Sequence, residues 1–221
     1  MQADNTLIKL SSVRYAYEGR PVLFESLDFA LCSGERVGIV GGNGCGKTTM
    51  LHIVMGLKKP AAGSVAVMGK RMDCEKDFAH AREQIGFLFQ DSDDQLFCPT
   101  VEEDIAFGPL NLGKTHSQAR EIVREVLAEL GMSGFEKRVT HRLSAGEKRM
   151  IALATVLAMK PQALLLDEPT ASLAQDHIER LEEILASMNI AYAIVSHDVQ
   201  FLRRTTDTLL RLEDGVLRCD S

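Results

Sequence analysis

Residues 41–48 have the types and spacing that are typical of a phosphate-binding loop. The run Gly-Gly-Asn-Gly-Cys-Gly-Lys-Thr matches G-x-x-x-x-G-K-[ST] and lies between an apolar segment, residues 37–40, and a predicted helix over residues 47–55. Its glycines let successive backbone N–H groups turn toward phosphate oxygens, beside the positive end of the helix. The sequence therefore predicts a nucleotide site in which Lys47 reaches the β- and γ-phosphates and the Thr48 hydroxyl binds Mg²⁺.

Two adjacent carboxylates follow a second apolar segment. Residues 163–166 have the pattern of a buried strand, and Asp167 and Glu168 come directly after it. The carboxyl end of a strand is where an α/β sheet presents groups that bind ligands. We expect Asp167 to hold Mg²⁺ through water and Glu168 to orient and deprotonate an attacking water. The simpler alternative is that the two carboxylates belong to a solvated turn. The presence of the phosphate-binding loop makes this alternative less favoured.

A serine and a glutamate three residues apart precede a predicted helix over residues 147–159. Ser144 and Glu147 match the capping box S-x-x-E, which by itself would explain both residues. A serine hydroxyl, Gly146 and the free N–H groups of a helix start also form an anion site. Both interpretations are open at the level of sequence.

The elements that position these residues follow from the hydrophobic pattern. Residues 7–17 and 22–31 have the alternation of strands, with no helix between them, and predict an antiparallel β part. Farther along, strand-like runs alternate with helical patterns, which indicates a mainly parallel sheet covered on both faces. The predicted strands are 37–40, 65–67, 85–89, 163–166 and 191–195, the predicted helices are 47–55, 117–130, 147–159 and 178–188, and a terminal hairpin turns at 214–215.

Composition narrows the class of protein. The 221 residues include 25 Lys+Arg and 31 Asp+Glu, and the net charge of −6 argues against a nucleic-acid partner. The longest apolar stretch, residues 151–159, is too short to span a bilayer, and the first residues lack the pattern of a secretory signal. The five cysteines form no C-x-x-C pair, which favours reduced thiols in a cytosolic protein. Cys45 in the phosphate-binding loop is interpreted as a small filler.

The order of these motifs resembles the ATP-binding cassette (ABC) ATPases over essentially the whole chain. Residues 143–147 are similar to the family's Leu-Ser-Gly-Gly-Gln signature, residues 41–48 to its Walker A loop and residues 164–168 to its Walker B strand. The resemblance implies one ABC ATPase domain over residues 1–221. Its expected fold is α/β, with a P-loop NTPase core built on a parallel sheet, an N-terminal antiparallel β subdomain and a helical signature subdomain over residues 92–160.

The resemblance also implies ATP and Mg²⁺ as cofactors and a role for each matching residue. Tyr17 would stack on adenine, Gln90 would be the glutamine of the Q-loop, and His197 would hydrogen-bond the γ-phosphate. The implied catalytic residues are Lys47, Glu168 and His197, and the implied Mg²⁺ site of the bound ATP comprises Thr48, Gln90 and Asp167. The implied nucleotide-binding residues are Tyr17, Gly41, Gly42, Asn43, Gly44, Cys45, Gly46, Lys47, Thr48, Thr49, Gln90, Ser144 and Gly146.

Members of this family work as pairs, so the resemblance implies a homodimer or heterodimer of ATPase subunits. ATP would lie between two chains, with Ser144 and Gly146 contacting the γ-phosphate held by the P-loop of the second chain. Three departures from the family pattern bear on turnover: Ala145 and Glu147 stand where glycine and glutamine are usual, and Ala174 replaces the aspartate of the D-loop, residues 171–174.

A more particular likeness lies after Gln90. The run Asp-Asp-Gln-Leu-Phe, residues 93–97, looks like the energy-coupling-factor (ECF) importers, especially their cobalt/nickel group. This implies a peripheral ATPase on the cytoplasmic face of the cell membrane, bound to integral membrane subunits. Leu96 and Phe97 would form an apolar patch for such a subunit, although both could equally be core residues. A vitamin-importing ECF ATPase, a non-transport ABC ATPase and a simple P-loop kinase are the alternatives.

Overall fold

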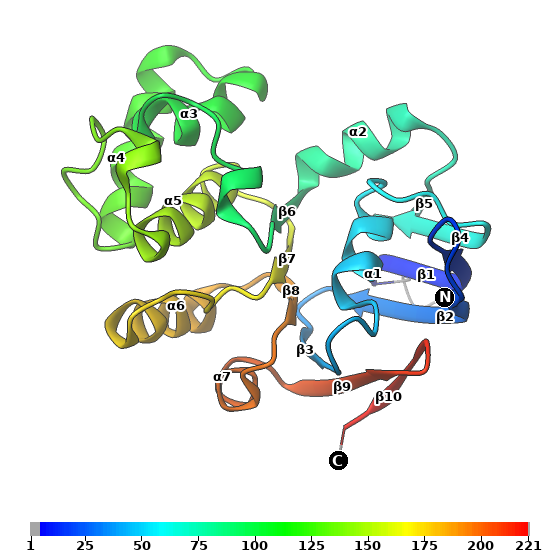
Figure 1. The fold of residues 1–221 in the computed structure, drawn as a ribbon. Helices are drawn as coiled ribbons and strands as arrows, with labels where there is room; N and C mark the ends of the chain where they lie inside the picture. Colours follow the sequence, from blue (N-terminus) through cyan, green and yellow to red (C-terminus); the bar gives the residue numbers. More distant parts are fainter. Residues whose placement is uncertain (1–4, 221) are drawn as a thin grey trace.

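The computed structural model describes residues 5–220, which form two sheets and the helices around them (Figure 1). The larger sheet has six strands in the order β10-β9-β3-β8-β7-β6. Its strands are β3 (Arg36–Val40), β6 (Ile85–Leu88), β7 (Ala163–Asp167), β8 (Ala191–Val195), β9 (Thr208–Glu213) and β10 (Val216–Cys219). All of them pair in parallel except β10, which runs antiparallel to β9. Strands β7 and β8 are buried along their whole length, as expected for a parallel sheet covered on both faces.

The smaller sheet is antiparallel and comes from the first part of the chain. Its order is β2-β1-β4-β5, and all its pairings are antiparallel. The strands are β1 (Thr6–Ala16), β2 (Val22–Cys32), β4 (Ala62–Val67) and β5 (Lys70–Arg71). The expected antiparallel β part is therefore confirmed, and it packs beside α1 (Lys47–Val54) (Figure 1).

The two faces of the central sheet belong to two different hydrophobic cores. Because side chains alternate along a strand, Leu165 and Ala193 face the core that contains α1 and the antiparallel sheet. Leu164 and Ile194 face the opposite core, which contains the long helices of the second half. This two-sided burial confirms the α/β architecture predicted from the alternating pattern.

The helices between β6 and β7 gather away from the antiparallel sheet (Figure 1). They are α3 (Val101–Asn111), α4 (His116–Glu129) and α5 (Ala145–Leu157), with short 3-10 turns at Ser92–Asp94 and Thr140–Arg142. Capping boxes start all three, for example Thr100 with Glu103 at α3. These elements fall within residues 92–160, and their status as a subdomain of a single domain stays a prediction.

The hydrophobic pattern does not predict three of the helices, although α3 begins at the capping box of Thr100 and Glu103. Ala81 is the only buried residue of helix α2 (Glu75–Gln84), so this helix has no continuous apolar stripe. Helix α3 carries Pro109 within it, a residue that normally breaks a helix. Helix α7 (Val199–Thr205) has seven residues, too few for a periodic pattern. The remaining expected helices are present, including α6 (Gln175–Ser187). Within residues 5–220, no helix is both long and apolar enough to cross a membrane.

Candidate nucleotide site

The phosphate-binding loop leaves β3 and enters α1 through a conformation that only glycine suits. Gly46 caps α1 with φ of 108°, and a Cβ there would lie 2.5 Å from the Phe24 ring. No side chain among residues 5–220 caps the helix, so the N–H groups of its first turn remain available to a ligand at the loop. The Lys47 ammonium donates to the carbonyl oxygens of Gly41 at 2.8 Å and Gly42 at 3.1 Å. The loop therefore presents N–H donors and a cation together, which suits a polyphosphate.

A cavity of about 310 Å³ opens on this loop. It is lined by Tyr17, Arg20, Leu23, Asn43, Gly44, Gly46, Lys47, Thr48, Thr49, Gln90, Asp167 and Glu168. The fold thus brings together most of the residues that the sequence placed at the nucleotide and its metal. Gly41, Gly42 and Cys45 do not line this cavity, and the Cys45 sulfur lies 4.0 Å from the Lys47 ammonium nitrogen.

Asp167 is the strongest sign of a cation site in this cavity. The residue is 0% exposed, and neither of its carboxylate oxygens has a hydrogen-bond partner among residues 5–220. Burial raises the pKa of its carboxyl group, and the nearby Thr48 hydroxyl offsets that rise only in part. Two unpartnered carboxylate oxygens beside a threonine hydroxyl and the Gln90 side chain fit the oxygen ligands that Mg²⁺ prefers.

Glu168 stands one residue farther on in a strained backbone conformation. Its φ is +50°, which is unfavourable for a residue other than glycine. Its Oε2 accepts hydrogen bonds from the Ser196 hydroxyl at 3.1 Å and the His197 N–H at 3.3 Å, and it lies 2.8 Å from the His197 Nδ1. The His197 side chain is 75% exposed, whereas the Glu168 side chain is 11% exposed. This arrangement can hold a carboxylate in a fixed direction as an acceptor for a water proton.

The aromatic residue expected at the base of the nucleotide follows β1. The Tyr17 hydroxyl is hydrogen-bonded to the Thr49 hydroxyl at 2.8 Å, which connects it to the first turn of α1. Two cations lie over its ring, the Lys58 ammonium at 5.1 Å and the Arg20 guanidinium at 6.0 Å. The ring therefore stands at the cavity edge, next to positive charge.

The signature residues lie elsewhere, at the start of α5. The Ser144 hydroxyl accepts from the Glu147 N–H at 3.3 Å, and the Glu147 carboxylate accepts from the Ser144 N–H at 2.8 Å. The capping-box interpretation is thus confirmed. Gly146 approaches the D-loop closely, because a Cβ there would lie 2.9 Å from the Ser172 carbonyl oxygen. Neither Ser144 nor Gly146 lines the P-loop cavity of its own chain.

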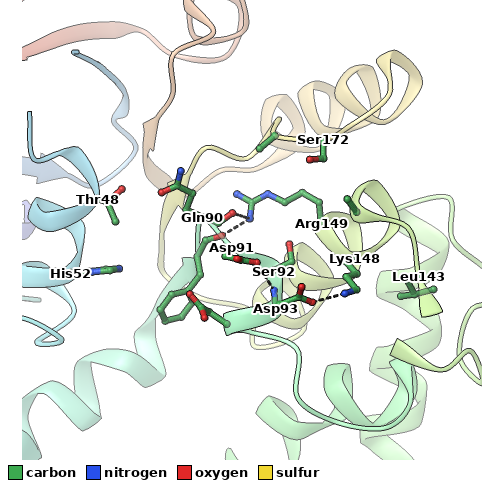
Figure 2. Close-up of a pocket in the computed structure, with 14 residues that line it drawn as sticks. Thr48, His52, Gln90, Asp91, Ser92, Asp93, Leu143, Lys148, Arg149 and Ser172 are labelled. Atoms are coloured by element: carbon green, nitrogen blue, oxygen red, sulfur yellow. Dashed lines mark hydrogen bonds and ion pairs between the residues drawn. The ribbon is translucent and has the colours of Figure 1, made fainter. Parts of the chain in front are cut away.

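A second, larger cavity of about 920 Å³ separates α1 from α5 (Figure 2). Thr48 and His52 lie on its α1 side, and Lys148 and Leu143 lie on the α5 side. The segment after β6 runs between them, so Gln90 borders both this cavity and the P-loop cavity. This placement makes Gln90 a link between the nucleotide site and the helical region.

Some residues at the site had no role in the sequence interpretation. Arg20 and Leu23 line the P-loop cavity from the loop and strand after Tyr17, and Ser196 binds Glu168. Arg149, just after the signature, donates to the carbonyls of Asp167 and Glu168. Ser196 was traceable as the neighbour of His197, whereas the others carry no motif.

Comparison with known proteins gives a consistent result. The family described as ABC transporter matches residues 24–171. A putative ABC transporter ATP-binding protein of Nitratidesulfovibrio vulgaris is 50% identical over 215 residues, which cover 96% of this chain and 78% of that protein. The energy-coupling factor transporter ATP-binding protein EcfA of Methanothermobacter thermautotrophicus is 42% identical over 216 residues, which cover 96% of this chain and 69% of that protein.

Solved structures share the fold. The structure of cbiO1 from Clostridium perfringens, part of the ABC transporter complex cbiONQ, matches with a TM-score of 0.84 at 31% identity, covering 97% of this chain and 88% of that one. The dimeric ATP-binding cassette MJ0796, bound to ADP and Pi, matches with a TM-score of 0.89 at 25% identity, covering 97% and 98%.

The phosphate-binding loop, the parallel sheet and these matches define an ATP-hydrolysing P-loop protein. The chain belongs to the ABC transporter ATP-binding family. As an ABC ATPase it binds and hydrolyses ATP, and ATPases of this kind dimerise, as MJ0796 does.

Proposed function

We propose that this chain is the ATPase subunit of an ECF-type importer that energises uptake of cobalt or nickel. The supporting observations are the likeness to EcfA, the structural match to cbiO1 and the Asp-Asp-Gln-Leu-Phe run at residues 93–97. The chain would act as a peripheral subunit at the cytoplasmic face of the membrane. Because the described residues include no group of three or more metal-ligating side chains, another subunit would bind the transported ion.

An apolar groove carries the proposed contact with a membrane subunit. It measures about 380 Å³, and Leu57, Phe97 and Phe107 expose large side chains at it. Phe97 is 65% exposed, and its ring meets that of Phe107 edge to face at 4.9 Å. Leu96 is buried instead, so only one of the two residues expected in the patch lies at the surface. An exposed aromatic pair in an apolar groove supports docking of an apolar helix segment.

We assign the chemical steps to residues of the P-loop cavity. Lys47 and the N–H groups of the loop would hold the phosphates, Thr48, Gln90 and Asp167 would hold Mg²⁺, and Tyr17 would contact the base. The bound ion would supply charge neutralisation at the phosphates. Glu168, directed by Ser196 and His197, would take a proton from the attacking water.

The second half of each site would come from a second copy or a close relative of this chain. Ser144 and Gly146 lie at an exposed helix start and do not reach the P-loop of their own chain. The Ser144 hydroxyl and the Gly146 N–H group would contact the γ-phosphate bound by the other subunit. Two chains would therefore close head to tail around two ATP molecules, and water would be excluded at closure.

The dimer is tested with Glu168→Gln, which should retain ATP because the P-loop is unchanged. Size-exclusion chromatography with light scattering, run with Mg-ATP, should show a dimer that dissociates when ATP is removed. A variant that stays monomeric alone and in mixture with a coexpressed ATPase relative would refute the ABC site assignment.

Docking and cargo need separate measurements. Phe97→Asp should abolish copurification with the membrane subunits encoded beside the gene, whereas Val216→Asp, an exposed apolar residue on β10, should not. Both variants should retain ATP-dependent dimerisation. Cells that coexpress these subunits should accumulate labelled Co²⁺ or Ni²⁺ only with the intact ATPase. Accumulation of a labelled vitamin instead would overturn the cargo assignment and leave the docking surface in place.

A further inference from the structure

Arg149 is a buried cation that is surrounded by backbone carbonyls. The residue is 2% exposed, and no ion pair includes it within residues 5–220. Burial lowers the pKa of its guanidinium group to about 10, so the group is still charged at neutral pH. Burying a charge is costly, and hydrogen bonds to several dipoles, together with the nearby Asp167 and Glu168 carboxylates, offset that cost.

The guanidinium reaches from α5 to the ends of two neighbouring parallel strands. Its Nε donates to the Pro169 carbonyl at 3.3 Å, and its Nη2 donates to the carbonyls of Asp167 and Glu168, the latter at 2.8 Å. These are three consecutive carbonyls, from the last residue of β7 and the two residues after it. Its Nη1 donates to the carbonyls of the segment after β6, those of Phe89 and Gln90, the latter at 3.3 Å (Figure 2).

These bonds act on the part of the backbone that is strained. Glu168 has φ of +50°, a conformation that costs on the order of 1–3 kcal/mol and persists only where its surroundings hold it. On one side the Glu168 N–H donates to the Val195 carbonyl at 2.8 Å, and on the other side Arg149 binds the Glu168 carbonyl. Arg149 thus fixes the peptide from which the Glu168 side chain extends toward His197.

We propose that Arg149 is a positioning residue for ATP hydrolysis. It aligns the Glu168 carboxylate through the backbone, without touching the nucleotide. It also connects this alignment to α5, the helix that begins at the signature. The inference rests on the proposed role of Glu168. The planar fork of arginine is required, because a lysine ammonium cannot reach five carbonyls of two strands from the same position.

The test replaces the planar guanidinium group of Arg149 and keeps its positive charge. Arg149→Lys should lower kcat for ATP hydrolysis by about 10–100-fold, because a misplaced general base loses the aligned geometry. The KM for ATP and the affinity for a fluorescent ATP analogue should change less than about twofold, since the P-loop is untouched. Arg180→Lys is the matched control: Arg180 also donates to a carbonyl of another element, that of Glu129 at 2.7 Å, but lines no part of the P-loop cavity. Its kcat should match the wild type.

A second pair of variants separates positioning from a structural role. In a Glu168→Gln background, adding Arg149→Lys should lower the residual rate by less than about twofold, because Arg149 acts through the carboxylate that is already missing. An equal loss in both backgrounds, a parallel loss of ATP affinity, or a wild-type kcat would overturn the proposal. If Arg149→Lys is insoluble, the same rates are measured for Arg149→Gln. Insolubility of both variants would show that Arg149 has a structural role and would also overturn the proposal. A wild-type rate for Glu168→Gln alone would instead refute the site assignment.

Discussion

Asp167→Asn should make the protein more stable in the absence of nucleotide and Mg²⁺. The carboxylate is fully buried and neither oxygen has a hydrogen-bond partner among residues 5–220, so burial disfavours its charged form in the folded state. An unsatisfied buried polar group costs about 1–3 kcal/mol, and more when it is charged. Asparagine removes the charge but keeps a polar amide, so we expect a gain of about 1–2 kcal/mol at pH 7.

The pH dependence of this gain follows from the direction of the pKa shift. Burial raises the pKa of Asp167 in the folded state above its unfolded value, which is about 3.9. Below the unfolded pKa the carboxyl group is protonated in both states, and the wild type carries no ionisation penalty. As the pH rises from the unfolded pKa through the folded pKa, the free energy of unfolding of the wild type falls, because burial disfavours the charged carboxylate. The difference between variant and wild type should therefore be small near pH 3.5 and grow toward neutral pH.

Thermal unfolding in EDTA at several pH values is the measurement. For a chain of this length, 1 kcal/mol shifts Tm by about 2–4 °C, so Asp167→Asn should raise Tm by about 2–8 °C at pH 7. Glu168→Gln is the control, since its carboxylate is bound by Ser196 and His197 and its removal should not stabilise. Mg-ATP should raise the Tm of the wild type and not that of Asp167→Asn. A lower Tm for ligand-free Asp167→Asn at pH 7 would refute the reasoning.

Three further substitutions have definite expected outcomes. Ala174 is the N-cap of α6, and no side chain among the described residues caps this helix. Ala174→Asp should therefore raise the free energy of unfolding by about 0.5–2 kcal/mol in urea titration, and no change would show that the helix start cannot accept a cap. Gly46→Ala should cost about 1–3 kcal/mol of stability from its positive φ alone. It should also abolish binding of a fluorescent ATP analogue, because the new Cβ displaces Phe24. Retained binding would contradict a rigid loop. Ser144→Ala should cost about 1 kcal/mol of stability through the lost cap and should also weaken the ATP-dependent dimer. Thr115→Ala should lose only the cap at α4. Equal dimerisation of the two variants would argue against the signature contact.

The amino-acid sequence by itself determined the local chemistry. The loop from Gly41 to Thr48, the carboxylates after β7 and the capping box at Ser144 are contiguous or nearly so, and each depends on the backbone conformation of a few neighbouring residues. The buried strands β7 and β8 were visible for a similar reason, because a strand covered on both faces is apolar throughout. Such features need no knowledge of the partners that surround them.

Only the tertiary structure decided which distant residues meet. Strand β8 lies between β3 and β7, which brings Ser196 and His197 onto Glu168, and no pattern along the chain reveals that strand order. The structure also shows that Leu96 is buried whereas Phe97 is exposed. It places the Arg149 guanidinium group against carbonyls of residues up to 60 positions away in the sequence. Strand pairing and side-chain burial arise from the packing of segments that are remote in sequence. The spacing of neighbouring residues carries no record of that packing.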